Sequence, residues 1–299
     1  MENFTFRLFF IVILFISCSQ NDETPTPDVA EEESEMEVVE IPELILKTVS
    51  RNVVTTDNPP RVASFDIEGR IVTLENYGDV SEFFRDENGN ILYYDTPNPQ
   101  YVYENNIWTK TMSSTDTGAT ETLVTYNNNN ITLQGRDLFD DEDFYFRNVY
   151  TFEDDSYSKI ISIETIDNSS GQILSRTTYE YTGNNTTRVF TERIDQSTGE
   201  LTPRKDQVFY YDQKINPYKK GLPQNIGLHL NLQFLELGDF RQITYLSQNN
   251  VTKVDVTDFF NESQGSIFYE YEYNDLDYPT TRMQINGETL RAESTFEYH

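Results

Sequence analysis

The chain has a single cysteine, Cys18, and the residues around it indicate a specific covalent modification. It follows an apolar stretch, Leu8 to Ile16, that is preceded by one basic residue, Arg7. This stretch is too short to span a bilayer and is typical of the core of a signal peptide. Ser17-Cys18 is then the cleavage junction of a lipoprotein signal peptidase. We therefore predict that Cys18 becomes the first mature residue, with its sulfur carrying diacylglycerol with acyl chains such as palmitate.

Two other interpretations of this N-terminus stay open. The apolar stretch could be a buried strand or helix with Cys18 as an ordinary thiol, or the protein could be secreted and released freely. The acidic segment that follows leaves the stretch nothing adjacent to pack on, which favours the lipoprotein, although Phe15 stands where a lipobox usually has Leu. Gln20-Asn21-Asp22-Glu23 resembles a short export signal of surface lipoproteins. We expect an outer-membrane lipoprotein of a Gram-negative bacterium, at the cell surface or otherwise facing the periplasm.

Groups suited to acid, base or nucleophilic catalysis are scarce. The two histidines are His229 and His299, and the sequence has no Gly-x-Ser-x-Gly motif. We interpret His229 as structural or solvent-facing. Zinc is not expected without clustered His and Cys, and carboxylates are too abundant for a glycosidase pair to be recognised. We predict no enzymatic activity and no cofactor.

One acidic cluster is a candidate for calcium, which prefers hard oxygen ligands and is abundant outside the cytoplasm. It consists of Asp137, Asp140, Asp141, Glu142 and Asp143. The spacing does not match an EF-hand, because no glycine follows at the sixth position. The alternative, which we favour, is a solvated hairpin loop of mutually repelling carboxylates.

Composition divides the chain into residues 1–17, a signal peptide, residues 18–44, an acidic tether, and residues 45–299, a single domain. The tether has ten carboxylates and no Lys or Arg, so it cannot bury enough apolar area to offset its ordering entropy. We expect it to be disordered and to hold the domain away from the membrane.

Net charge restricts the partners of the domain. Of 51 acidic and 22 basic residues, eleven acidic and two basic ones precede residue 51, so residues 51–299 carry about −20. Nucleic acid and anionic lipid headgroups are therefore not expected as partners. Because Cys18 is the only cysteine, its lipidation would leave packing and sheet hydrogen bonds to hold the fold.

Alternating apolar and polar residues predict strands throughout the domain. Ile267, Tyr269, Tyr271 and Tyr273 alternate with Phe268, Glu270, Glu272 and Asn274. In the same way, Leu290, Ala292, Ser294, Phe296 and Tyr298 alternate with Arg291, Glu293, Thr295 and Glu297. This period of two puts aromatic rings on one face of an antiparallel sheet. Between these runs, Asn286-Gly287 predicts a two-residue type I′ hairpin turn.

A turn motif recurs along the chain. Asp66 to Ile71 is repeated as Asp86 to Ile91, and Ile166 to Ile173 as Ile194 to Leu201. In each copy an Asp can accept backbone hydrogen bonds, and a Gly can take the positive φ that closes the turn. The motif predicts hairpin joints with Gly69, Gly89, Gly171 and Gly199 in left-handed positions, and hence a meander.

These Asp-x-x-Gly turns and Tyr-x-Tyr strands resemble degenerate YD (Rhs-like) repeats. The stretches Tyr211 to Tyr218, Asn249 to Lys253 and Tyr271 to Thr280 are similar to uncharacterised bacterial lipoproteins with a porin-like fold. The resemblance implies an antiparallel β architecture over most of residues 45–299 and no particular activity. The sequence departs from the pattern at Asp275-Leu276-Asp277-Tyr278, which has no glycine.

The predicted fold class is all-β: an antiparallel meander of repeated hairpins forming a large twisted sheet or partly closed barrel. A long connection at about 214–240, broken by Pro and Gly, interrupts it, and Leu228 to Leu237 could cover the sheet or gate a ligand. Most of the tyrosines are expected to line the core.

Three functions follow, in order of preference. The first is a membrane-anchored, non-catalytic binding or scaffold module with a glycan or protein partner, as in surface adhesion. The second is a carrier of a lipid-like or apolar ligand in the curved sheet, and the third is an enzyme acting on polysaccharide. An exposed strip of Tyr and Trp108 would favour the first, an apolar cavity the second and two facing carboxylates the third.

Overall fold

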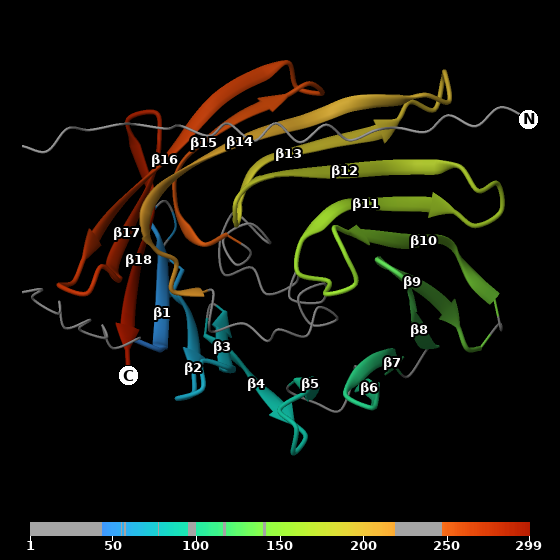
Figure 1. Ribbon diagram of the computed structural model, residues 1–299, viewed down its shortest axis with the longest axis horizontal. Helices are drawn as coiled ribbons and strands as arrows, with labels where there is room; N and C mark the ends of the chain where they lie inside the picture. Colours follow the sequence, from blue (N-terminus) through green and yellow to red (C-terminus); the bar gives the residue numbers. More distant parts are fainter. Residues whose placement is uncertain are drawn as a thin grey trace, which may run out of the picture. The chain divides into compact units, whose positions relative to one another are not determined.

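The computed structural model describes residues 44–54, 56, 58–76, 78–94, 100–115, 118–139, 142–218 and 247–299 (Figure 1). Residues 41–299 form one compact unit, and the other unit, residues 1–40, lies outside the described residues. The strands are β1 (Leu46–Val53), β2 (Arg61–Phe65), β3 (Ile71–Asn76), β4 (Asp79–Arg85), β5 (Ile91–Tyr94), β6 (Gln100–Glu104), β7 (Ile107–Thr115), β8 (Gly118–Asn127), β9 (Asn130–Asp137), β10 (Glu142–Phe152), β11 (Ile160–Asp167), β12 (Ile173–Thr182), β13 (Asn185–Ile194), β14 (Leu201–Ile215), β15 (Asn249–Asp258), β16 (Ser263–Tyr273), β17 (Pro279–Asn286) and β18 (Thr289–Tyr298).

These strands form one 18-stranded antiparallel sheet in which neighbours in sequence are neighbours in space. The two ends of the series are joined through β1: Val49 lies opposite Ala63 of β2 and also opposite Phe296 of β18. The described strands therefore form one nearly closed, barrel-like sheet. The all-β meander predicted from the sequence is confirmed. In the described part of the chain, no helix has the length and apolarity needed to cross a membrane.

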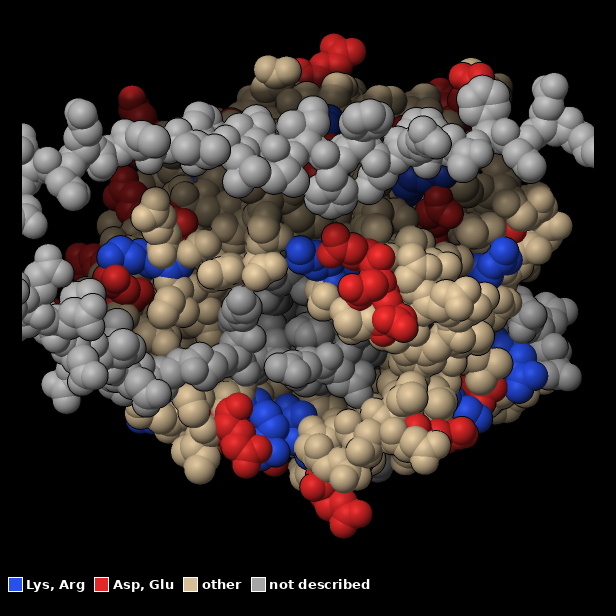
Figure 2. All heavy atoms as spheres, in the orientation of Figure 1, with Lys and Arg blue, Asp and Glu red and all other residues tan. Residues whose placement is uncertain are grey.

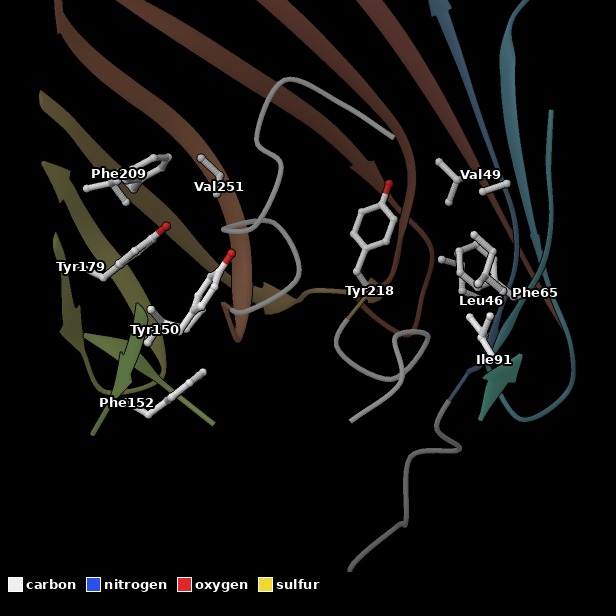
Figure 3. Close-up of a cluster of buried hydrophobic side chains, with 14 of the residues drawn as sticks. Leu46, Val49, Phe65, Ile91, Tyr150, Phe152, Tyr179, Phe209, Tyr218 and Val251 are labelled. Atoms are coloured by element: carbon white, nitrogen blue, oxygen red, sulfur yellow. The ribbon is translucent and has the colours of Figure 1, made fainter. Parts of the chain in front are cut away.

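The core lies on the concave face of this sheet, where the alternating pattern directs the apolar side chains. Along β18, Ala292, Ser294 and Phe296 are buried, and the residues between them are exposed. Figure 3 shows Tyr150 and Tyr179 from one wall and Leu46 and Phe65 from another, all directed into the same interior. The expectation that the tyrosines line the core is confirmed for Tyr101, Tyr150, Tyr179 and Tyr269, each less than a tenth exposed.

Several core tyrosines donate their hydroxyl proton to a backbone carbonyl at or near the start of the preceding strand. The pairs are Tyr126 with Trp108 (2.9 Å), Tyr181 with Ile160 (2.9 Å), Tyr271 with Val251 (2.9 Å), Tyr298 with Pro279 (2.7 Å) and Tyr211 with Thr186. Burial raises the pKa of Tyr126 and Tyr181 to about 12, so these phenols stay neutral and remain donors at physiological pH. Because the acceptors start β7, β11, β13, β15 and β17, the five bonds lie at the same end of the sheet.

The recurring turn has the geometry that its sequence predicts. Asp66 Oδ1 accepts the backbone N–H groups of Glu68 and Arg70, and Asp86 accepts those of Asn88 and Asn90, all at 2.9 Å. The glycines that close the turns have positive φ: +77° at Gly69, +82° at Gly89, +72° at Gly171 and +75° at Gly199. The left-handed assignment of all four is confirmed.

The same turn also forms where the sequence has no glycine. Asn274 takes the role of Asp by accepting the N–H groups of Leu276 and Tyr278, and Asp277 occupies the glycine position with φ +64°. Short polar side chains adopt this conformation at lower cost than bulky ones. The missing glycine at 275–278 therefore alters the sequence pattern without changing the turn.

The prediction for Asn286-Gly287 is wrong in register. Asn286 pairs with Thr289, so the two loop residues are Gly287 and Glu288, and only Gly287 has positive φ (+60°). A positive φ at the first loop residue alone is typical of a type II′ turn. The register of the same hairpin also shifts between Gln284 and Ile285, where Arg291 of β18 is the extra residue.

The long connection predicted at about 214–240 begins later than expected, because β14 continues to Ile215. Residues 219–246, with His229 and Leu228 to Leu237, lie outside the described residues. The two flanking positions are tied together: the Asn216 side chain donates to Ser247 O (2.9 Å), and Asn216 N donates to Gln248 O (3.1 Å). The chain thus leaves β14 and returns to β15 at one fixed place.

We predict that Gly171→Ala lowers the free energy of unfolding by about 1 kcal/mol, because a β-carbon disfavours φ of this sign. No atom lies within 4 Å of the added carbon, so the cost is one of backbone conformation alone. Gly118→Ala is the control, since its site is equally open and its φ is not left-handed. Urea unfolding measures both, and equal stability of the two variants would contradict the assignment.

A second prediction concerns pH. Hydrogen bonds from Ser169 and Ser170 lower the pKa of Asp167 from 3.8 to about 2. The stabilisation is therefore complete above the unfolded-state pKa and is lost as pH falls through about 2. Asp167→Ala should lower the melting temperature at pH 7. At pH 1.5 it should leave the melting temperature unchanged, because most of the wild-type Asp167 is then protonated and has lost the stabilising charge. The exposed Asp275→Ala variant is the control, and a difference that persists at pH 1.5 would refute this account.

Candidate binding groove

The structure brings few of the sequence-predicted site residues into view. Cys18 and His229 lie outside the described residues, as do Asp140 and Asp141 of the calcium candidate. Asp137 Oδ1 accepts the N–H of Phe139 (2.8 Å), and Glu142 and Asp143 begin β10. In the described part of the chain, no three His, Cys, Asp or Glu residues are grouped so as to hold a metal ion. His299 contacts Phe65 O through Nε2 (3.1 Å), which ties the last residue to β2.

Trp108 is a core residue, so it does not belong to an exposed aromatic strip. It is 1% exposed, and its indole N–H donates to Lys110 O (2.9 Å) and Thr111 Oγ1 (3.1 Å). The most exposed large aromatic side chains are instead Phe139, Tyr145 and Phe260, each at least 70% exposed. Of these, Phe260 lines a cavity.

That cavity is an open groove of about 620 Å³, within the range of about 300–1,000 Å³ that is typical of small-ligand clefts. It lies near the joints of the β11–β12, β13–β14 and β15–β16 hairpins. Its lining residues are Ser175, Thr191, Glu192, Arg193, Arg204, Lys205, Asp258 and Phe260. We call it the hairpin groove.

Strand register places most of these side chains on the concave face. Thr191 lies opposite Lys205, and Lys205 opposite Asp258, so the three form a row across β13, β14 and β15. Thr191 is two residues from the buried Val189, and an interval of two keeps both side chains on one face. Ser175 and Arg193 form the next row. The groove is therefore the polar continuation of the core face toward the hairpin ends.

Phe260 contributes an aromatic surface to the groove. It stands in the β15–β16 turn with 70% of its surface exposed, and the Arg204 guanidinium lies 4.7 Å from its ring centroid. Asp258 holds this turn, because its Oδ1 accepts the N–H groups of Phe260 and Asn261. The ring is thus fixed at its backbone while most of its surface stays open to a ligand.

Asp258 is an unsuitable proton donor for catalysis. Hydrogen bonds from the backbone and side chain of Asn261 lower the pKa of its carboxyl group, whereas a general acid of a glycosidase needs a raised pKa. Its Oδ2 also accepts the amide of Asn261 (2.8 Å). This carboxylate serves the turn, and the groove is suited to binding.

A second polar feature is a row across β16, β17, β18 and β1 on the core face. Tyr271 lies opposite Arg282, Arg282 opposite Ser294, and Ser294 opposite Arg51. Arg282 is 6% exposed, donates to Ser294 Oγ (3.1 Å) and lies 5.7 Å from the centroid of the Tyr269 ring. Burial raises the pKa of Tyr271 and Tyr218, so these phenols are neutral neighbours of the guanidinium. Arg51 donates to Gln284 Oε1 (3.1 Å).

Sequence reasoning missed both features. Arg193, Arg204 and Lys205 form a basic group within an acidic chain, and this is a signal that could have been noticed. Bringing them together with Ser175 and Asp258 requires the register of three ladders, which the sequence pattern does not specify.

No protein-family model and no curated protein matches this chain. Among solved structures, a porin-like protein from Bacteroides uniformis ATCC 8492 is similar with 12% identity and a TM-score of 0.44, covering 85% of this chain and 96% of that one. A porin-like protein from Bacteroides vulgatus ATCC 8482 has 11% identity and a TM-score of 0.38, with coverage of 86% and 99%. The N-terminal domain of the effector protein SpvB from Salmonella typhimurium strain LT2 has 8% identity and a TM-score of 0.23, with coverage of 83% and 86%. With TM-scores below 0.5, these likenesses carry no functional argument, and the YD-repeat and lipoprotein assignments stay predictions.

Proposed function

We propose that this protein is a membrane-anchored extracytoplasmic binding module that binds a glycan in the hairpin groove without catalysis. The observation that carries the proposal is the groove itself: an open cavity of about 620 Å³ with an exposed aromatic ring and hydroxyl-bearing side chains. A pyranose ring presents C–H groups to an aromatic face and hydroxyl groups to polar neighbours. Phe260 supplies the first kind of contact, and Ser175 and Thr191 supply the second.

Phe260→Ala should weaken glycan binding by about 3- to 10-fold, since an aromatic contact contributes about 0.5–1.5 kcal/mol. Affinity electrophoresis of the full-length protein through gels containing a panel of polysaccharides measures the effect. Phe268→Ala is the matched control, because Phe268 is also exposed and pairs in the same sheet opposite Lys253. Equal retardation of both variants would remove the groove as the glycan site.

The anchor is part of the same proposal. The Ser17-Cys18 junction and the acidic tether support an outer-membrane lipoprotein that presents the domain at the cell surface. Metabolic labelling with an alkyne fatty acid should label the wild type, and Cys18→Ala should lose both the label and membrane retention. Persistent label on Cys18→Ala would overturn the anchor and leave the groove proposal standing.

The buried arginine row favours a second candidate function, a carrier of an amphiphile with an anionic head. Every partner that the described residues give Arg282 is neutral, and a charge buried in this way is costly until an anion compensates it. Tyr218, Tyr269 and Tyr271 would offer aromatic surface to an apolar tail. Organic extraction and mass spectrometry of the purified protein should then find an anionic lipid that Arg282→Gln loses and that Arg188→Gln, on the convex face, retains.

A further inference from the structure

The basic side chains on the two faces of the sheet differ in whether a carboxylate neutralises them. On the convex face of β12, β13 and β15, each of three basic side chains is neutralised by a neighbouring carboxylate. Arg176 Nε lies 2.7 Å from Glu164, Arg188 Nε 2.8 Å from Asp206 and Lys253 Nζ 2.9 Å from Asp255. Figure 2 shows the same mixture on the face in view, with acidic and basic groups next to one another.

The cations of the hairpin groove do not follow this pattern. Among the described residues, no carboxylate lies within 4 Å of the charged group of Arg193, Arg204 or Lys205. The Arg204 Nε is buried and has no hydrogen-bond acceptor. In a chain with a net charge of −29, three cations without a direct ion pair converge on one cavity, and Asp195 and Asp258 attract Arg204 and Lys205 only from beyond 4 Å.

The two carboxylates of the groove, Glu192 and Asp258, cancel only part of this charge. Asp258 accepts hydrogen bonds within its own turn from Asn261 and the N–H of Phe260, and its charge also attracts Lys205 on the opposite strand. The lining residues carry three positive charges, on Arg193, Arg204 and Lys205, and two negative charges, on Glu192 and Asp258, which leaves a surplus of one positive charge. Since charges are screened over about 8 Å at physiological ionic strength, this local surplus, and not the distant acidic excess, governs what binds there.

We infer that the hairpin groove binds a saccharide segment that carries carboxylate or sulfate groups, which Arg193, Arg204 and Lys205 recognise beside the Phe260 ring. This inference rests on the proposed function and adds the ligand's charge. Guanidinium groups suit planar, bidentate recognition of oxyanions, and Lys205 adds a point charge in the row between Thr191 and Asp258. A saccharide is favoured over an anionic lipid headgroup because hydroxyl side chains and an open ring line the same cavity.

The test compares ligands that differ only in charge. The full-length protein in a nonionic detergent is titrated calorimetrically with a galacturonate hexasaccharide and with its methyl ester, which keeps the backbone and removes the carboxylates. A chondroitin sulfate hexasaccharide tests the sulfate group. The acid or the sulfated form should bind at least about tenfold more tightly than the ester, which corresponds to about 1.4 kcal/mol.

Variants test whether the difference in affinity between the charged and the esterified saccharide arises in the hairpin groove. Arg193→Gln combined with Lys205→Gln should remove most of the preference for the charged ligand, and Arg188→Gln, on the convex face of the same strand, should keep it. Thermal unfolding monitors the fold, and Lys205→Met alone provides a second variant if the double substitution destabilises the protein.

Three outcomes would overturn the inference. If the ester binds as tightly as the acid and the sulfated form while Phe260→Ala still weakens binding, the groove is a neutral glycan site and the proposed function stands. If phosphatidylglycerol vesicles bind through Arg193 and Lys205 and no saccharide does, the ligand is a lipid headgroup. If no saccharide binds and Phe260→Ala changes nothing, the proposed function fails as well.

Discussion

A buried phenol must find an acceptor for its proton, and this constraint governs the core of the protein. The chain has 20 tyrosines, and in the described residues many of them face the interior. A buried hydroxyl without a partner costs about 1–3 kcal/mol, so the tyrosines can replace aliphatic residues only where an acceptor is in reach. The backbone carbonyls near the starts of alternate strands provide such acceptors, as the bonds of Tyr126 and Tyr181 illustrate.

This constraint also couples each of these tyrosines to the strand that precedes its own. Each of these tyrosines, near the end of one strand, bonds the carbonyl near the start of the strand before it, at a separation of 18 to 25 residues. Tyr271 and Val251 are 20 residues apart, and Tyr298 and Pro279 are 19 apart. These hydrogen bonds lie at one end of the sheet. The hairpin ends at the opposite end do not have to provide acceptors for these tyrosine hydroxyls. The groove is found at that opposite end.

The sequence predicts those features that depend on nearby residues. Alternation along β16 and β18 identifies the core face, and Asp followed by Gly identifies the turns, because both depend on contacts within a few residues. The turn at Asn286 is misplaced by one residue because the register of β17 on β18, which includes an extra residue at Arg291, is not marked by any local signal. The groove depends on register across three ladders, so its residues appear unrelated until the strands are paired.

The position of the groove gives the fold a way to separate stability from binding. Along β12, β13, β14 and β15 the concave face changes from Tyr179, Val189, Phe209 and Val254 in the core to Ser175, Arg193, Lys205 and Asp258 toward the hairpin ends. Substituting a buried apolar residue removes packing and leaves a cavity, whereas substituting a polar residue near a hairpin end alters mainly hydration and charge. Charge in the groove can therefore change at little cost in folding free energy, provided that the turn held by Asp258 is kept. A site built in this way can be adjusted to a new ligand while the sheet that positions it stays the same.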